Sequence, residues 1–358
     1  MSQNLGNEGV QHACCTPKIR DTPEIEASLI LWQEIISIIE SHHSFIITSH
    51  INPDCDALGS ELALAEQLRY LGKQVTVINS DVTPPMYRFL DSKRRIKQYS
   101  STKHAALIHR ADVVFVLDAS GGWERVGAVG QALAQTPAIK VCIDHHPDAT
   151  DFVDIAVIDT DAAATAELIY DLFVKMEAKI SKQMAQALYA AIITDTGNFR
   201  FPKTSPKTHC ITAKLVEAGA VPSTMYQKIY EQNSLGSVRL KGHVMESIRT
   251  AAQGQIAYYG LTQKTLKEYG AQNSELDGFA SLGQPIAGVR VVIFCSEASQ
   301  GRIKISLRSD GSVAINQIAA AYNGGGHTSA AGAIVEGNLE DILTELVKKV
   351  ETLLVGNN

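Results

Sequence analysis

The sequence predicts an α/β protein, in which a doubly wound, mostly parallel sheet forms an N-terminal domain and a smaller α+β domain follows. Three observations support this fold class. A chain of 358 residues is long enough for about two domains. Short apolar runs alternate with helix-like segments from about residue 44 to residue 215, and a second group of strand-like runs begins near residue 253.

The first domain begins with a β-α-β unit. Between its two strands, apolar residues recur at helical spacing from Leu58 to Leu68, and Gly72 marks the end of the helix. Four runs are apolar enough for strands that are buried on both faces: FIITSH (45–50), QVTVIN (74–79), VVFVLD (113–118) and IKVCIDHH (139–146). Sheets of this kind bind their ligands beyond the carboxyl ends of the strands.

The second domain contains three further strand-like runs and two helices. The strands are expected at QIAYYGLT (255–262), VRVVIFCSEAS (289–299) and RIKISLRS (302–309), and the helices at 313–322 and 339–354. We expect an N-terminal tail over 1–27, a first domain over 28–215, a helical linker over 216–242 and a second domain over 243–358. Residues 202–242 hold six basic and two acidic residues, which either line a cleft or decorate a solvated connector.

Composition and charge exclude several classes of protein. The formal charge of -6 argues against a protein that coats long nucleic acid, although a small anionic substrate is possible if bound cations neutralise it. No run approaches the roughly 18 apolar residues of a membrane span. The first 25 residues have no basic start with an apolar stretch, and the six cysteines form no C-x-x-C pair. We therefore expect a cytoplasmic protein with reduced thiols and no membrane partner.

Acids and imidazoles gather where the predicted strands end. An Asp after a strand is commonly a helix cap, and a His pair in a loop is commonly just polar. Eight such residues together are more than helix caps and turns require. Their oxygen and nitrogen donors suit two divalent ions such as Mn²⁺ better than Zn²⁺ held by thiolates. The eight residues are His50, Asp54, Asp56, Asp118, Asp144, His145, His146 and Asp195. Cys55 and Cys142 lie nearby, and we expect them to point into the packing.

Two neighbouring metal ions are typical of enzymes that hydrolyse phosphoesters, because they activate a water and neutralise the charge on phosphorus. The carboxylate that bridges both ions should come from the centre of the sheet, which favours Asp118. Neither G-x-x-x-x-G-K-[ST] nor G-x-G-x-x-G occurs, so a P-loop and a dinucleotide-binding site lose their main support.

These motifs resemble those of a known family. HINPDCDALGS, VVFVLDAS, IDHHP and TDTGNFRF resemble the four motifs of the DHH phosphoesterases, and NGGGHTSAAG resembles the glycine-rich signature of their associated C-terminal domain. The resemblance covers roughly residues 28 to 350. Within the family, TDTGNFRFPKTSPKTH and the two-domain length are similar to the nanoRNase/pAp phosphatase subgroup, of NrnA type.

The resemblance implies a role for each motif residue. His50, Asp54 and Asp118 would hold one Mn²⁺, and the ligands of the other would be Asp56, Asp118, His145 and Asp195. His146 would contact the substrate phosphate, and Asp144 would orient an imidazole by accepting its other N–H. In the second domain the resemblance implies these substrate contacts: Arg308, Gly324, Gly325, Gly326 and His327. For the three glycines, a flexible loop at a helix end is the competing interpretation.

The activity implied is Mn²⁺-dependent hydrolysis of very short oligoribonucleotides such as pApA to mononucleotides, with removal of phosphate from pAp as a second activity. Water activated by the metals can attack any phosphodiester, so the metals do not select the substrate. We therefore expect the second domain to select it, with the Arg308 guanidinium binding a terminal phosphate. Long polymers are not expected as partners. The sequence leaves the oligomeric state open, a homodimer included.

Other functions compete with this interpretation. A cyclic di-AMP phosphodiesterase would use the same site. A RecJ-like exonuclease would need an extended basic or aromatic path for single-stranded DNA, which a chain with 6% aromatic residues and a negative charge does not favour. A family II pyrophosphatase lacks the GGGH pattern. A nucleotide-binding regulatory module would keep the fold without the chemistry and would be expected to lose metal-site residues of the motifs. Every metal-site position of the motifs is present in this sequence.

Overall fold

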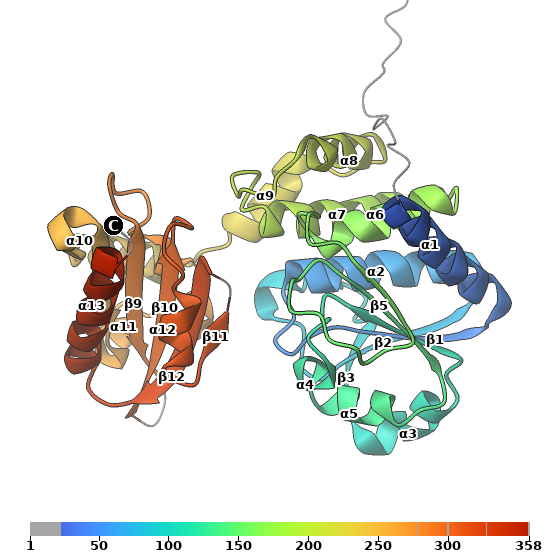
Figure 1. Ribbon diagram of the computed structural model, residues 1–358, viewed down its shortest axis with the longest axis horizontal. Coiled ribbons are helices and arrows are strands. Elements are labelled where there is room, and N and C mark those ends of the chain that lie inside the picture. The colour runs from blue at the N-terminus through green and yellow to red at the C-terminus, as the bar shows by residue number, and fades with distance from the viewer. Residues whose placement is uncertain (1–22, 277, 299–300, 327, 357–358) are drawn as a thin grey trace, which may run out of the picture. The chain divides into compact units, whose positions relative to one another are not determined.

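The computed structural model describes residues 23–276, 278–298, 301–326 and 328–356. The chain divides into two compact units, the first ending at Gln232 and the second beginning at Asn233 (Figure 1). The segment 216–242, for which the sequence predicts a helical linker, holds α9 (Pro222–Tyr230) of the first unit and the first part of α10 (Leu235–Glu246) of the second.

The first unit is built on a six-stranded sheet in the order β3-β2-β1-β4-β5-β6, and every neighbouring pair is parallel. The predicted doubly wound parallel sheet is therefore confirmed. The strands are β1 (Ser44–Thr48), β2 (Gln74–Asn79), β3 (Ile96–Gln98), β4 (Val113–Leu117), β5 (Ile139–Asp144) and β6 (Ile155–Ile158). The chain adds β2 and β3 on one side of β1 and then returns to add β4, β5 and β6 on the other side. The carboxyl ends of β1 and β4 therefore flank the crevice where such sheets bind ligands.

Helices cover both faces of this sheet. One face packs against α1 (Pro23–Ser41), α2 (Cys55–Tyr70), α6 (Thr165–Lys175) and α7 (Lys182–Asp195), on which α8 (Pro206–Glu217) and α9 are layered (Figure 1). The other face carries α3 (Ser101–His109), α4 (Trp123–Val126) and α5 (Ala128–Ala134). A 3₁₀ turn, η1, spans Pro85–Tyr87.

Strand β4 shows why the apolar runs predict strands with two buried faces. Val113, Phe115 and Leu117 belong to the core under α2 and α7. Val114 and Val116 belong to the core on the opposite face. All five side chains are fully buried, so neither face could carry the polar alternation of a half-exposed strand.

Gly59 lets helices α2 and α7 approach closely. A Cβ at this buried position would lie 2.6 Å from the carbonyl oxygen of Ala187 and 2.9 Å from Cβ of Ala191. The close approach matters for the site, because Asp56 lies in the first turn of α2 and Asp195 is the last residue of α7.

The second unit also has a six-stranded sheet, in the order β11-β12-β10-β9-β8-β7, in which only the β8–β9 pair is parallel among the described strands. Its strands are β7 (Arg249–Ala251), β8 (Ile256–Leu261), β9 (Val291–Glu297), β10 (Arg302–Ser309), β11 (Gly325–Gly326) and β12 (Ala330–Glu336). Its helices are α10, α11 (Gln263–Glu268), α12 (Asn316–Ala320) and α13 (Leu339–Gly356), with 3₁₀ turns η2 (Ala252–Gly254), η3 (Asn273–Glu275) and η4 (Phe279–Ser281). The predicted α+β class is confirmed.

One predicted helix is shorter than expected. The apolar spacing predicts a helix over 313–322, whereas α12 spans only Asn316–Ala320. The chain at Ile315 is held by another segment, because its backbone N–H donates to the carbonyl of Thr328. At the other end Asn323 has a positive φ of 55°, which stops the helix.

The cysteine prediction is correct in part. Cys55, Cys142 and Cys295 are free, buried thiols, and the first two pack in the apolar cores as expected. Cys210 is disulfide-bonded, so the expectation of reduced thiols is wrong there. A disulfide depends on which thiols the tertiary structure brings together, and the spacing of cysteines along the chain does not show this. Among the described residues, no helix has the length and apolar character needed to span a bilayer.

The contact at Gly59 predicts a loss of stability for Gly59→Ala. The added methyl group must push α2 away from backbone of α7, and overpacking of this kind costs about 1–3 kcal/mol. The matched control is Gly242→Ala in α10, where a Cβ meets nothing within 4 Å. Alanine there should leave stability unchanged or raise it by up to about 1 kcal/mol. Urea unfolding of both variants measures the difference, and equal stability of the two would show that the α2–α7 contact tolerates a methyl group.

Candidate metal centre

Three neighbouring strands deliver most of the predicted site residues to one edge of the first sheet. His50 follows β1, Asp118 follows β4, and Asp144 ends β5 directly before the two histidines 145 and 146. Strands β1, β4 and β5 are adjacent in the sheet. The site therefore lies at the carboxyl ends of the central strands, where the sequence places it.

Asp118 lies at the centre of the cluster. Its carboxylate is only 1% exposed, and its two oxygens face different histidines. Oδ2 lies 3.4 Å from Nε2 of His50, and Oδ1 lies 3.6 Å from Nε2 of His145. Asp118 also has a φ of 60°, an uncommon conformation for a residue other than glycine, and one that concentrates at functional sites.

The first group of possible ligands consists of His50, Asp54 and Asp118. Nε2 of His50 lies 3.9 Å from Oδ1 of Asp54. Asp54 is also the N-cap of α2, because its Oδ1 accepts hydrogen bonds from the backbone N–H groups of Asp56 and Ala57 at 2.9 and 3.1 Å. Its side chain is 50% exposed. The capping role and the ligand role are therefore compatible in this residue.

The second group consists of Asp56, His145 and Asp195. Nε2 of His145 lies 3.9 Å from Oδ2 of Asp56 and 3.4 Å from Oδ2 of Asp195. Asp56 comes from the start of α2 and Asp195 from the end of α7. Because Asp118 faces His145 as well as His50, it is the residue that joins the two groups.

The two imidazoles at the centre are fixed by backbone carbonyls. Nδ1 of His50 lies 2.7 Å from the carbonyl oxygen of Ile51, and Nδ1 of His145 lies 3.2 Å from that of Ala162. A carbonyl oxygen can only accept, so Nδ1 carries the proton in both rings. In a neutral ring Nε2 then presents a lone pair toward the carboxylates, which is the arrangement of a metal-binding histidine.

Burial and charge act differently on the two histidines. Burial lowers the pKa of His50, but hydrogen bonds to Asp118 and Asp54 and their charges raise it to about 11. Burial prevails for His145, whose pKa lies below its ordinary value although Asp118 raises it. The neutral His145 therefore points a lone pair at three carboxylates, and a divalent cation bound between these atoms would remove the repulsion.

The carboxylates show the same conflict. Burial raises the pKa of Asp56 and of Asp195 well above the usual range, and the negative charge of Asp118 adds to both shifts. Burial acts in the same direction on Asp118, yet hydrogen bonds to His146 and His50 hold its pKa below the usual range. A cluster of buried acids that disfavour one another's ionisation is a donor set that fits divalent cations.

Asp144 organises the loop after β5. It is fully buried, and its Oδ1 accepts from the backbone N–H groups of His145 and His146 at 2.6 and 3.1 Å, while Oδ2 accepts from that of Ser120 at 2.6 Å. Nδ1 of His146 lies 2.7 Å from Oδ1 of Asp144, which is the expected orienting contact. The same ring nitrogen lies 3.4 Å from Oδ1 of Asp118. Asp118, Asp144 and the two histidines form a third group of possible ligands.

The sequence reasoning missed the N-terminus of helix α6. The backbone N–H groups of Thr165 and Ala166 donate to the two oxygens of Asp56 at 2.7 and 3.0 Å. The hydroxyl of Thr165 donates to Oδ1 of Asp118 at 2.9 Å. A Thr at the start of a helix signals a helix boundary, but nothing in the sequence pairs it with acids so far away along the chain.

One lysine of the basic segment 202–242 contacts the candidate metal centre. Nζ of Lys203 donates to the carbonyl oxygen of His145 at 3.4 Å. Two other lysines of the basic segment 202–242 form ion pairs on the surface, Lys207 with Asp171 at 2.7 Å and Lys214 with Glu217 at 2.9 Å. Both interpretations of the segment therefore apply in part. Lys203 lies beside the candidate metal centre, as a cleft-lining residue would, while Lys207 and Lys214 lie on the surface.

The residues predicted in the second unit lie at one end of its sheet. Arg308 of β10 is opposite Ala330 of β12, and Gly326 of β11 is opposite Ala331. Gly324 and Gly326 allow close packing, because a Cβ would lie 2.2 Å from the carbonyl oxygen of Gly332 and 2.4 Å from that of Ala330, respectively. Gly325 faces open space. His327 lies outside the described residues.

Because the hydroxyl of Thr165 donates to Asp118, we expect its removal to lower the affinity for metal. Thr165→Val keeps the shape and the backbone donor but removes the bond to Asp118, and loss of such an orienting partner lowers metal affinity by about 10- to 100-fold. Thr165→Ser keeps the hydroxyl and should retain most of the affinity. Calorimetric titration with Mn²⁺ measures both variants. Equal affinity of the Val and Ser variants would show that the hydroxyl does not orient Asp118.

Comparisons with known proteins agree with this geometry. Residues 44–192 match the DHH family, N-terminal domain, and residues 253–355 match the DHHA1 domain. A Bacillus subtilis (strain 168) protein named bifunctional oligoribonuclease and PAP phosphatase NrnA is 29% identical over 305 residues, which cover 84% of this chain and 92% of that protein. The uncharacterized protein MG371 of Mycoplasma genitalium is 30% identical over 302 residues, which cover 83% of this chain and 88% of that protein.

A solved structure shows the same architecture. The crystal structure of an exopolyphosphatase-related protein from Bacteroides fragilis matches with a TM-score of 0.87 and 29% sequence identity, and the match covers 91% of this chain and 98% of that one. The two domain matches fall on the two units in the order that the sequence motifs predict. This chain belongs to the DHH phosphoesterase family, with a DHH domain followed by a DHHA1 domain.

Proposed function

We propose that this protein is a two-metal phosphoesterase that hydrolyses very short oligoribonucleotides such as pApA, and also acts on pAp. The observation that carries the proposal is the placement of Asp118, whose two carboxylate oxygens face the two groups of possible ligands. His50 and Asp54 lie on one side, and Asp56, His145 and Asp195 on the other. The relative from Bacillus subtilis, named an oligoribonuclease and PAP phosphatase, supports the choice of substrate.

The residues of this chain have distinct tasks in the proposed reaction. When bound, two divalent ions such as Mn²⁺ would lower the pKa of a water and offset the charge on the phosphate. Asp118 bridges the two ligand groups, and the hydroxyl of Thr165 fixes its orientation. Asp144 holds the ring of His146 through Nδ1, and we propose that this ring contacts a phosphate oxygen of the substrate.

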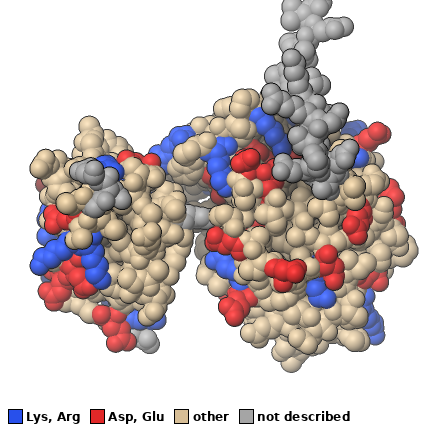
Figure 2. All heavy atoms as spheres, in the orientation of Figure 1, with Lys and Arg blue, Asp and Glu red and all other residues tan. Residues whose placement is uncertain are grey.

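Charge supports a short substrate. On the face that Figure 2 shows, acidic and basic side chains are interspersed over both units. The net charge of -6 is unlike that of a protein that binds a long polyanion along a groove. We propose that the second unit contributes the contacts that select the substrate, with the Arg308 guanidinium, the glycines 324–326 and His327 as the residues involved.

Replacement of the bridging carboxylate tests the proposed site. Asp118→Ala should lower turnover of pApA with Mn²⁺ by about 1000-fold or more, because both ions lose a ligand. The matched control is Asp154→Ala, which removes an exposed acid of the same unit that belongs to none of the three ligand groups. The control should keep normal turnover. Near-normal turnover by Asp118→Ala, with unchanged metal content, would contradict the two-metal site.

Substrate length tests the choice of substrate. Turnover should fall steeply from a dinucleotide to an oligonucleotide of about 20 residues, because binding is concentrated on a few groups at the end of the substrate. Added salt should have little effect, since few phosphate contacts release few counterions. Equal efficiency on both lengths, or a steep loss of affinity with salt, would favour the RecJ-like alternative.

A further inference from the structure

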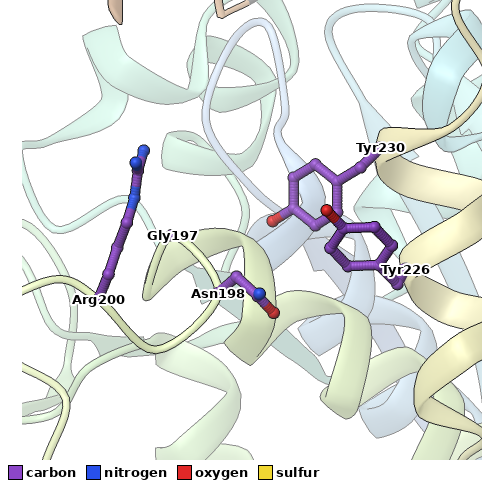
Figure 3. Close-up of a pocket in the computed structure, with 5 residues that line it drawn as sticks. All are labelled: Gly197, Asn198, Arg200, Tyr226 and Tyr230. Carbon is purple, nitrogen blue, oxygen red and sulfur yellow. The ribbon is translucent and has the colours of Figure 1, made fainter. Parts of the chain in front are cut away.

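A cavity of about 330 Å³ lies in the first unit beside the last turn of α7 (Figure 3). Its lining residues are Gly197, Asn198, Arg200, Tyr226 and Tyr230. In Figure 3 the two tyrosines project from α9 on one side of the view, Arg200 lies on the other side, and Asn198 lies between them on the loop that follows α7. The volume is at the lower end of the range for pockets that bind small ligands.

The loop at this cavity has an unusual backbone. Gly197, Asn198 and Phe199 have positive φ values of 55°, 61° and 66°. Glycine adopts this conformation freely and asparagine adopts it readily, but for Phe199 it is costly and persists only where the surroundings fix it. Here the hydroxyl of Thr196 accepts from the N–H of Phe199 at 3.0 Å, and the carbonyl of Thr196 accepts from the N–H of Arg200 at 3.0 Å. The result is a tight turn that aims Asn198 at the tyrosines.

The two tyrosines form the opposite wall. They are four residues apart on α9, and their ring centroids are 4.9 Å apart. The hydroxyl of Tyr230 donates to the carbonyl oxygen of Ile193 at 3.2 Å, which ties this wall to the last turn of α7. Tyr226 is 42% exposed, so its ring is accessible. Accessible aromatic rings are typical platforms for nucleic-acid bases, and Tyr226 offers one.

The cavity is joined to the metal centre through α7. Ile193 and Gly197 are each two residues from Asp195, which belongs to the second ligand group. Residues two positions apart are separated by no more than about 7 Å between their Cα atoms. A nucleotide whose phosphate lies at the metal centre therefore has a pocket for its base within reach.

We propose that this pocket binds one base of the dinucleotide substrate, with Tyr226 as the stacking surface and the Asn198 amide as the hydrogen-bonding group for the base edge. The inference deepens the proposed function and rests on it. An amide can both donate and accept, so it can pair with the edge of a base. Arg200 adds a positive charge to the lining of the cavity, and a guanidinium group can bind phosphate oxygens.

The experiment combines enzyme variants with substrate analogues. The variants are Tyr226→Ala, Tyr226→Phe and, as a matched control, Tyr70→Ala, which removes an exposed tyrosine of the same unit outside the cavity. The substrates are pApA and two abasic analogues, in which hydrogen replaces the base of the first or of the second nucleotide. KM and kcat are measured with Mn²⁺ for each combination, together with the Kd of AMP by calorimetry.

Tyr226→Ala should raise KM for pApA about tenfold, which corresponds to the loss of stacking with one base, and should leave kcat nearly unchanged. Tyr226→Phe keeps the ring and should behave like the wild type, as should Tyr70→Ala. With one of the two abasic analogues the wild type should already show the raised KM, and Tyr226→Ala should add nothing, because base and ring are coupled.

Two results separate failure of the pocket from failure of the proposed function. If the wild type hydrolyses pApA and Tyr226→Ala changes KM equally for all three substrates, or for none, the pocket does not bind a base. If the wild type does not hydrolyse pApA, the proposed function is wrong. The Kd of AMP then decides about the pocket, because an equal Kd for wild type and Tyr226→Ala would overturn it.

Discussion

The repulsion between buried acids at the end of the central strands is the interaction on which the rest of this structure depends. Asp56, Asp118 and Asp195 surround one neutral imidazole, that of His145, and burial makes each negative charge costly. Such an arrangement alone does not stabilise the fold. Two divalent ions would convert the repulsion into attraction, which is why the cluster is interpreted as a metal centre and its chemistry as phosphoester hydrolysis.

The fold holds these acids in place through backbone groups. The start of α2 fixes Asp54 by capping, the start of α6 fixes Asp56 with two N–H groups, and the N–H groups after β5 fix Asp144. Gly59 keeps α2 against α7, whose last residue is Asp195. The substrate pocket proposed here begins at the same end of α7. Catalysis and base recognition would thus share one rigid element, which favours accurate positioning of the phosphate.

The sequence predicts the first sheet well because its central strands are continuous apolar runs. It misses the short edge strands, which are β3 and β6 of the first sheet and β7 and β11 of the second. It also misses β12, whose sequence AAGAIVE is rich in small residues. The candidate ligand residues were predictable because they follow strands or belong to recognisable motifs. The contacts of Thr165 and Lys203 and the position of Tyr226 at the cavity were not predictable, since only the tertiary structure creates them. The predicted metal roles remain proposals.

The most direct test is the location of bound Mn²⁺ in crystals of the full-length protein, by anomalous scattering of the metal. Two peaks are expected for each chain. One should lie among His50, Asp54 and Asp118, and the other among Asp56, Asp118, His145 and Asp195, with a separation of about 3.5–4 Å. A single peak, or two peaks of which only one contacts Asp118, would contradict the central claim that this carboxylate bridges two ions.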